Sequence, residues 1–243
     1  MKSFIIAFFD IPIQILPIHK EVISFFNDYL SNDSPIIKIC MTEEDIELEK
    51  EIALQHYVKK EKINYYPRYQ LEIRAILRRI ANILPDHDAF LFHSSAVVYD
   101  SKAYLFSAPH GTGKTTHSLK WLKLLPGSYI LNGDKPFIII RKEHIYVCGT
   151  PWKGKEKLGR NSIQPLEAIC IIERGQNNQI TNISPEDAFL CLINQMFIPE
   201  NNTLKTIQLL QYTLNHTKLY RLLCNMEDKS ALISIGAMVD NDV

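Results

Sequence analysis

AYLFSAPHGTGKTT, residues 103–116, combines an apolar run, a loop with two glycines and the start of a helix. The apolar run at 103–107 predicts a buried strand, and the residues after Gly113 predict a helix over 114–124. The loop matches a known spacing: Ala or Gly, four residues, Gly-Lys, then Ser or Thr, with Ala108 in the first position. Strand, glycine-rich loop and helix in this order predict a phosphate-binding loop (P-loop) in an α/β protein.

The loop residues suit a nucleotide with Mg²⁺. Gly111 and Gly113 allow backbone turns that point successive N–H groups at phosphate oxygens, and the helix adds its positive end. Lys114 is expected to reach the β- and γ-phosphates, and Thr115 to ligate Mg²⁺. The predicted nucleotide contacts are Pro109, His110, Gly111, Thr112, Gly113, Lys114, Thr115 and Thr116. His110 could contact phosphate or face water, and His117 is expected to be structural. The alternative is a glycine-rich turn that binds no nucleotide.

An acidic residue follows the next predicted strand, 129–131, in the loop Asn132-Gly-Asp-Lys-Pro136. Asp134 therefore falls at the sheet edge where the phosphates would lie. There it could ligate Mg²⁺, orient an attacking hydroxyl, or both. The alternative is an aspartate that only forms the turn.

Two further segments carry candidate site residues. His93 lies on the predicted strand 90–98, one strand before the loop, and is expected to be a functional residue or, alternatively, a satisfied core residue. The basic loop 149–161 supplies Lys155 and Arg160, which we expect to clamp the acceptor or the γ-phosphate. Trp152 in this loop argues for a packed or stacked segment, whereas a run of charges alone usually lies on the solvated surface.

Composition excludes several functional classes. The 243 residues are 46% hydrophobic, and 27 basic residues balance 27 acidic ones, so no overall charge attracts nucleic acid or a membrane. Five scattered cysteines without a C-x-x-C pair argue against a metal knuckle or disulfide framework and favour the cytoplasm. The apolar run 4–9 is expected to be a buried strand, since it is too short for a signal peptide. Oligomeric state stays open, a homo-oligomer included.

The patterning divides the chain at residue 67. Residues 1–66 are expected to form a small α+β region, with strands at 3–9 and 36–40, a helix near 19–30, and a surface stretch at 42–62 in which Lys59, Lys60 and Lys62 are solvated. Residues 67–243 are expected to form the nucleotide-binding domain, which opens with a helix from Pro67 to Leu84. Its other predicted strands are 137–141, 144–148, 168–172, 180–183 and 219–224, and its other helices 185–198, 203–215 and 227–238.

Four motifs in order resemble the HPr serine kinase/phosphorylase superfamily, which shares its nucleotide fold with ATP-dependent phosphoenolpyruvate carboxykinase. They are His93-Ser-Ser-Ala-Val-Val98, Ser107-Ala-Pro-His-Gly-Thr-Gly-Lys-Thr-Thr116, Asn132-Gly-Asp-Lys-Pro136, and Gly149-Thr-Pro-Trp-Lys-Gly-Lys155 with Arg160-Asn161. The chain looks most like short kinase-like relatives, including those of lasso-peptide biosynthesis. The resemblance covers roughly residues 67–238 and implies an α/β fold with a mixed sheet and a P-loop, plus the small N-terminal α+β region.

The resemblance also implies roles for particular residues. His93 matches the family's histidine beside the phosphates, Lys114 and Thr115 match nucleotide and metal ligands, and Asp134 matches an acidic position. Relatives often carry two adjacent aspartates, whereas Asp134 stands alone between Gly133 and Lys135. The division between general base and metal ligand therefore stays open.

Three functions compete. The first is a kinase that uses ATP, or GTP, with Mg²⁺ to phosphorylate a hydroxyl, a serine of a peptide or small protein. The second is a carboxykinase-like enzyme acting on a small oxaloacetate-like acid, which the short chain disfavours. The third is a nucleotide-binding switch or scaffold without transfer activity, which the single Asp134 favours.

Overall fold

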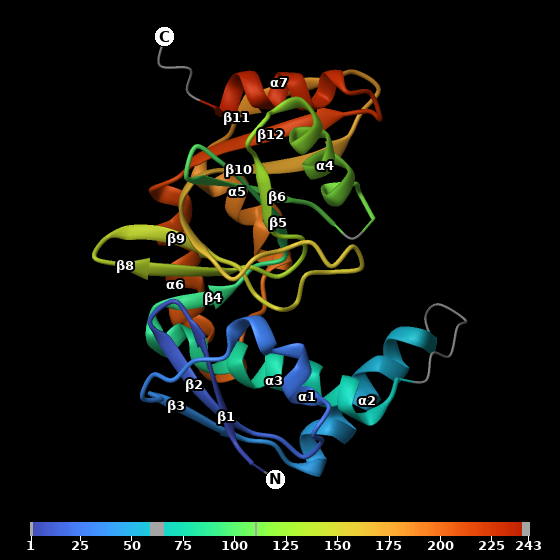
Figure 1. The fold of residues 1–243 in the computed structure, drawn as a ribbon. Helices are drawn as coiled ribbons and strands as arrows, with labels where there is room; N and C mark the ends of the chain where they lie inside the picture. Colours follow the sequence, from blue (N-terminus) through green and yellow to red (C-terminus); the bar gives the residue numbers. More distant parts are fainter. Residues whose placement is uncertain (1, 59–65, 110, 240–243) are drawn as a thin grey trace. The chain divides into compact units, whose positions relative to one another are not determined.

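The computed structural model describes residues 2–58, 66–109 and 111–239. By their contacts the residues fall into two compact units, Met1–Ile83 and Leu84–Val243 (Figure 1). The sequence pattern changes at residue 67, whereas the helix that follows belongs by its contacts to the first unit. The predicted solvated lysines Lys59, Lys60 and Lys62 lie outside the described residues.

The described part of the first unit contains a three-stranded sheet of β1 (Phe4–Phe8), β2 (Ile11–Leu16) and β3 (Ile37–Cys40). The strands predicted at 3–9 and 36–40 are confirmed, and β2, which pairs antiparallel with β1 and parallel with β3, was not predicted. The helix predicted at 19–30 is wrong. Only α1 (Val22–Phe25) and a 3₁₀ turn, η1 (Asn27–Tyr29), form there, because Leu30 and Ser31 return to pair with β1.

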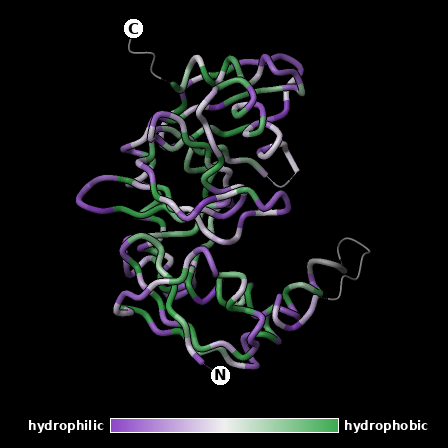
Figure 2. Tube along the Cα trace, viewed as in Figure 1, coloured by the Kyte–Doolittle hydropathy of each residue, from purple (hydrophilic) through white to green (hydrophobic). Residues whose placement is uncertain are grey.

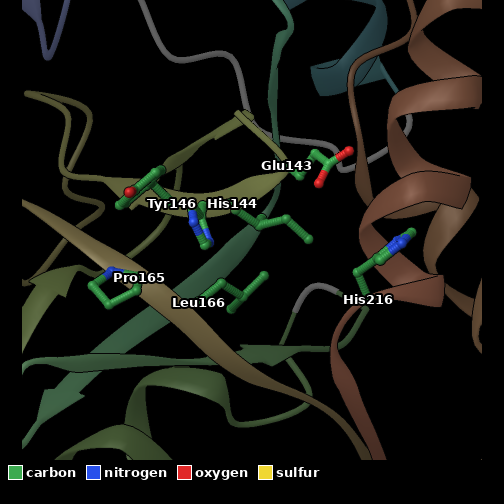
Figure 3. Close-up of a pocket in the computed structure, with 7 residues that line it drawn as sticks. Glu143, His144, Tyr146, Pro165, Leu166 and His216 are labelled. Atoms are coloured by element: carbon green, nitrogen blue, oxygen red, sulfur yellow. The ribbon is translucent and has the colours of Figure 1, made fainter. Parts of the chain in front are cut away.

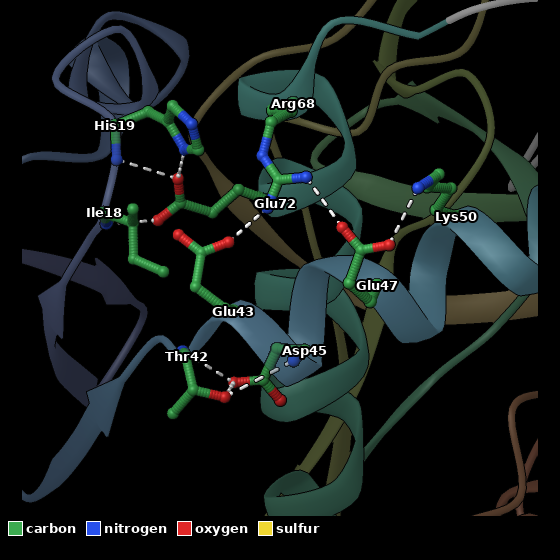
Figure 4. A network of polar contacts seen from close by, with 9 residues as sticks. All are labelled: Ile18, His19, Thr42, Glu43, Asp45, Glu47, Lys50, Arg68 and Glu72. Carbon is green, nitrogen blue, oxygen red and sulfur yellow. Dashed lines mark hydrogen bonds and ion pairs between the residues drawn. The ribbon is translucent and has the colours of Figure 1, made fainter.

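Two longer helices complete this unit, α2 (Glu43–Val58) and α3 (Arg68–Ile83). The helix predicted from Pro67 is confirmed one residue later, and its apolar stripe is buried at Ile73, Ile76 and Ile80. That stripe also contains a buried carboxylate, Glu72, with no solvent exposure. Its two oxygens accept hydrogen bonds from the backbone N–H groups of Ile18 and His19, at 2.6 and 2.9 Å. His19 Nδ1 lies 2.6 Å from the same carboxylate (Figure 4).

Replacing Glu72 should destabilise the first unit strongly. Glu72→Leu removes an acceptor shared by two backbone donors and an imidazole, and burying such groups unpaired costs about 3 kcal/mol. Urea unfolding followed by circular dichroism measures the loss, and hydrogen exchange assigns it to residues 2–58. Glu47→Ala, at an exposed ion pair with Lys50 and Arg68, is the control and should leave the midpoint nearly unchanged. Equal midpoints for the two variants would contradict the assignment.

The described part of the second unit forms a nine-stranded mixed sheet, ordered β4-β8-β9-β10-β6-β5-β7, with β12 and then β11 added beside β10. The long strand β10 connects its parts, since it pairs antiparallel with β9 at one end and parallel with β6 and β12 along the rest. The strands are β4 (Ala89–Leu91), β5 (Ser94–Tyr99), β6 (Lys102–Ser107), β7 (Tyr129–Asn132), β8 (Phe137–Arg141), β9 (His144–Cys148), β10 (Ile163–Arg174), β11 (Gln179–Asn182) and β12 (Lys218–Cys224).

Helices cover both faces of this sheet, because side chains along each strand alternate between two cores. Ala96, Val98 and Leu105 pack with residues of α5 (Pro185–Leu192) and α6 (Thr203–Asn215). The intervening Val97 and Phe106 pack with residues of α4 (Lys114–Leu124) and α7 (Lys229–Met238). Figure 2 shows hydrophobic residues along the strands and hydrophilic ones at the tip of the β8–β9 hairpin. The predicted α/β class with a mixed sheet is confirmed.

Two predicted elements of this unit are interrupted. The single strand expected at 90–98 is wrong, because β4 pairs with β8 whereas β5 pairs with β6 and β7. At the break, Phe92 and His93 donate their N–H groups to Pro136 and Gln195. The helix expected at 185–198 ends at Leu192 and continues as a 3₁₀ turn, η3 (Ile193–Gln195), because Met196 then pairs with Phe92. The other predicted elements are observed within a few residues, apart from β10, which is longer at both ends.

None of the helices in residues 2–58, 66–109 and 111–239 has the length and apolar character that a bilayer crossing requires.

Candidate active site

The loop between β6 and α4 is held from two sides. Gly111 and Gly113 have φ of 80° and 120°, the left-handed region that favours glycine. From the first turn of α4, the buried Lys114 side chain donates from Nζ to the carbonyl of Ala108 at 2.8 Å. From the end of β10, Arg174 donates from Nη2 to the carbonyl of Gly111 at 2.7 Å. The predicted contact His110 lies outside the described residues.

Asn132, at the end of β7, shapes the turn that carries Asp134. Its fully buried side chain accepts from the N–H groups of Asp134 and Lys135, at 2.9 and 2.7 Å, and donates to Thr150 at 3.0 Å. An asparagine that bonds to the backbone two residues on is a common turn-forming arrangement. The turn-forming role that the sequence left open for Asp134 therefore belongs to Asn132, and the Asp134 carboxylate is directed to other partners.

Those partners are a histidine, His93, and a lysine, Lys135. Asp134 Oδ1 lies 3.2 Å from His93 Nε2, and Oδ2 forms an ion pair with Lys135. Burial acts to raise the pKa of Asp134, but the hydrogen bond from His93 and the charge of Lys135 outweigh it and hold the pKa at about 2. The group is thus ionised at neutral pH. Its contribution to stability is present above the ordinary pKa of 3.8 and is lost as the pH falls through about 2.

The loop and the His93–Asp134 pair converge on one edge of the sheet. Ser94 pairs with Ser107, the last residue of β6, and its N–H donates to the carbonyl of Asp134 at 3.1 Å. Ser107 Oγ donates to the carbonyl of His93 at 3.1 Å. Burial lowers the pKa of Lys114, with the negative charge of Asp134 opposing that shift. Asp134, predicted separately from the other two, therefore contacts His93 and lies within electrostatic reach of Lys114.

The basic loop approaches the pair at one point. Gly154 has φ of 79°, and a Cβ built on it would lie 3.1 Å from Asp134 Cβ. Lys155 comes next in the chain, with an exposed side chain. The Arg160 guanidinium instead lies 4.1 Å above the ring of Tyr129, at the start of β7. Trp152 is buried against Phe137, with ring centroids 6.3 Å apart, so the loop is packed where the sequence suggested it.

Several residues at this edge were not assigned roles from sequence. Gln195 contacts His93 with its side chain and its backbone, and Asn132 and Lys135 build the Asp134 turn. Gln195 lies 102 residues from His93, so no local pattern could connect the two. The structural role expected for His117 agrees with its burial and its contact with Ser234 at 3.0 Å. Burial, with the charge of Lys120, lowers the pKa of His117 to about 4.

A separate cavity of about 250 Å³ lies where the β8–β9 hairpin meets β10 and the end of α6 (Figure 3). None of the residues predicted as functional lines it. The lining is Glu143, His144, Ile145, Tyr146, Pro165, Leu166 and His216. No group of three or more His, Cys, Asp or Glu side chains able to hold a metal ion occurs in the described ranges.

The chain has a low similarity to a solved structure and matches no family model. No curated protein matches it either. Among solved structures, the chain is similar to the HPr(Ser) kinase/phosphatase from Coxiella burnetii, at 11% identity and a TM-score of 0.31. The match covers 50% of this chain and 93% of that one.

Proposed function

We propose that the second unit is a kinase that transfers the γ-phosphoryl group of ATP to a hydroxyl, a serine of a peptide or small protein. The observation that carries the proposal is the convergence of the 108–113 loop and Lys114 with the His93–Asp134 pair. In-line phosphoryl transfer requires a phosphate cradle, charge neutralisation and an oriented nucleophile, and this edge offers a candidate for each.

The nucleotide, ATP or GTP, would bind on the loop. Backbone N–H groups of Gly111, Gly113, Lys114, Thr115 and Thr116 would face the phosphates in this proposal, helped by the positive end of α4. The Lys114 ammonium has three N–H donors. One donates to the carbonyl of Ala108, so two remain for a phosphate in this proposal.

We propose one carboxylate and one hydroxyl of the protein as ligands of Mg²⁺. Mg²⁺ typically takes one or two carboxylates and completes its shell with substrate phosphates and water, so a cluster of three acidic groups is not needed. Asp134, ionised at neutral pH, and the hydroxyl of Thr115 would hold it. When bound, the ion would neutralise charge on the β- and γ-phosphates.

The side chains of the site would orient the acceptor hydroxyl for transfer. Asp134 orients the acceptor hydroxyl, whose oxygen forms a bond to the γ-phosphorus as the bond to the β-phosphate oxygen breaks and ADP leaves. A carboxylate with a pKa of about 2 is a weak base, so orientation is its main contribution, and the hydroxyl proton passes to Asp134 only late, as the bond to phosphorus forms. His93 and Lys135 hold the carboxylate in place. Lys155 contacts the acceptor or the transferred group, whereas Arg160, stacked on Tyr129, is left out of this proposal.

The test is transfer of labelled γ-phosphate from Mg-ATP to serine-containing peptides, with ADP formation measured in parallel. Acceptor-dependent ADP release and acid-stable phosphoserine are expected. Oxaloacetate-dependent turnover would favour the carboxykinase instead. Tight nucleotide binding without turnover for any acceptor would favour the nucleotide-binding switch. The switch is the second candidate function because both Asp134 oxygens are already paired, one with His93 and one with Lys135.

Lys155→Ala should slow transfer by on the order of 10²-fold while nucleotide affinity stays within a few-fold. Lys155 follows Gly154, which packs on Asp134, and it lies outside the predicted phosphate cradle. The measurement compares single-turnover rates with calorimetric affinity for Mg-ATP. Lys157→Ala, two residues on and also exposed, is the matched control. Wild-type rates for Lys155→Ala would show that this part of the loop is only surface.

A further inference from the structure

We propose that Gln195 is a positioning residue that holds the His93 imidazole with Nε2 towards Asp134. The proposal rests on the proposed function, because it assigns Gln195 a part in the same transfer reaction.

Gln195 binds His93 at two places. Its backbone carbonyl accepts from the N–H of His93 at 2.7 Å, and its side-chain Oε1 lies 3.2 Å from His93 Nδ1. Across the ring, His93 Nε2 lies 3.2 Å from Asp134 Oδ1. One residue therefore fixes the backbone of His93 and also determines which ring nitrogen faces the carboxylate.

The segment that carries Gln195 is itself held in register. Met196 pairs with Phe92 in an antiparallel bridge, and Phe197 donates its N–H to the carbonyl of Leu91 at 3.4 Å. The backbone carbonyl of Gln195 continues this pairing to His93. Residues 195–197 thus run beside 91–93, at the break between β4 and β5. The side chain of Gln195 is half-buried, which limits competition from water for the Nδ1 contact.

The chemistry of the amide suits this position. A glutamine amide offers a carbonyl oxygen on one side and two N–H donors on the other. With the oxygen facing Nδ1, a protonated ring donates to Gln195 and to Asp134; with the amide turned, a neutral ring accepts from Gln195 and still donates from Nε2 to Asp134. Either way the Nε2–H remains on the carboxylate. The other charged groups of this edge, Lys135 and Lys114, act on Asp134 and on each other.

Three variants of the full chain test the proposal. Gln195→Met keeps the side-chain length and removes both hydrogen-bonding groups, whereas Gln195→Glu keeps an acceptor at the same place. Gln208→Met, at an exposed position of α6, controls for the substitution itself. Gln195→Met should lower kcat for transfer by about 10-fold to 100-fold, with KM for Mg-ATP within about twofold. Gln195→Glu, which has no donor for Nδ1 of an Nε2–H ring, should recover little of that loss, and Gln208→Met should match wild type.

The second readout needs no activity. Long-range ¹H–¹⁵N spectra of the histidine rings, with His93 assigned by His93→Gln, report which ring nitrogen carries the proton. We expect one Nε2–H form in the wild type and a mixture of forms in Gln195→Met. If the wild type transfers no phosphate, the proposed function fails, and the ring spectra still decide whether Gln195 positions His93. An unchanged His93 spectrum in Gln195→Met overturns the proposal, including when kcat and melting temperature fall together.

Discussion

Asp134→Asn should reduce the single-turnover rate of phosphoryl transfer by about 10²-fold or more while Mg-ATP affinity changes much less. The amide keeps the shape of the carboxylate, and the turn beneath it is preserved because Asn132 bonds to backbone N–H groups, which the substitution leaves in place. What is lost is a negative charge beside His93 and Lys135. Neither neighbour in sequence, Gly133 or Lys135, can supply a carboxylate.

The measurement is transfer by wild type and Asp134→Asn at saturating Mg-ATP. Asp228→Asn, at an exposed ion pair with Lys123, is the control for an Asp-to-Asn change elsewhere in this unit. Circular dichroism of Asp134→Asn verifies that the fold is kept once Lys135 loses its anionic partner. Rates within about threefold of wild type, too small a gap for a lost metal ligand or orienting group, would eliminate Asp134 and move attention to His93.

Lys114→Ala should abolish Mg-ATP binding. In the wild type a nucleotide at a hundredfold excess over its Kd stabilises the folded form by about 2.7 kcal/mol and raises the melting temperature. The variant should show no such rise in melting temperature, because it lacks the ammonium group that would bind the phosphates. Among the lysines of α4, the described structure gives a hydrogen bond to loop 108–113 from Lys114 alone. Calorimetry gives the affinity directly.

Two further variants keep this result interpretable. Lys123→Ala removes an exposed lysine of the same helix and should bind nucleotide like the wild type. Lys114→Met keeps most of the buried aliphatic stem, so it separates loss of the charge from loss of packing. Equal affinity in wild type and both Lys114 variants would defeat the assignment of this loop to phosphate binding.

Local patterns of sequence were sufficient for much of the second unit. The strand–loop–helix over β6 and α4 and the β8–β9 hairpin follow from apolar periodicity and turn residues, and both are observed. These signals work because strands and helices of this kind are specified by neighbours a few residues away. Strand order and the place where each strand ends put Lys114 and Asp134 at one sheet edge, whereas the place of His93 beside the phosphates came only from the family resemblance.

Tertiary structure decided the features in which distant segments compete with local preference. The pattern at 19–30 suits a helix, yet the pairing of Leu30 and Ser31 with β1 shortens it. The apolar run 90–98 suits one strand, yet β4 and β5 pair with different partners and separate at His93. Glu72 is buried on an apolar stripe only because Ile18 and His19 bring three partners to it. Gln195 likewise meets His93 across 102 residues. A hydrogen bond between such distant residues forms only when the tertiary fold brings the two segments together, and no short window of sequence contains both of its partners.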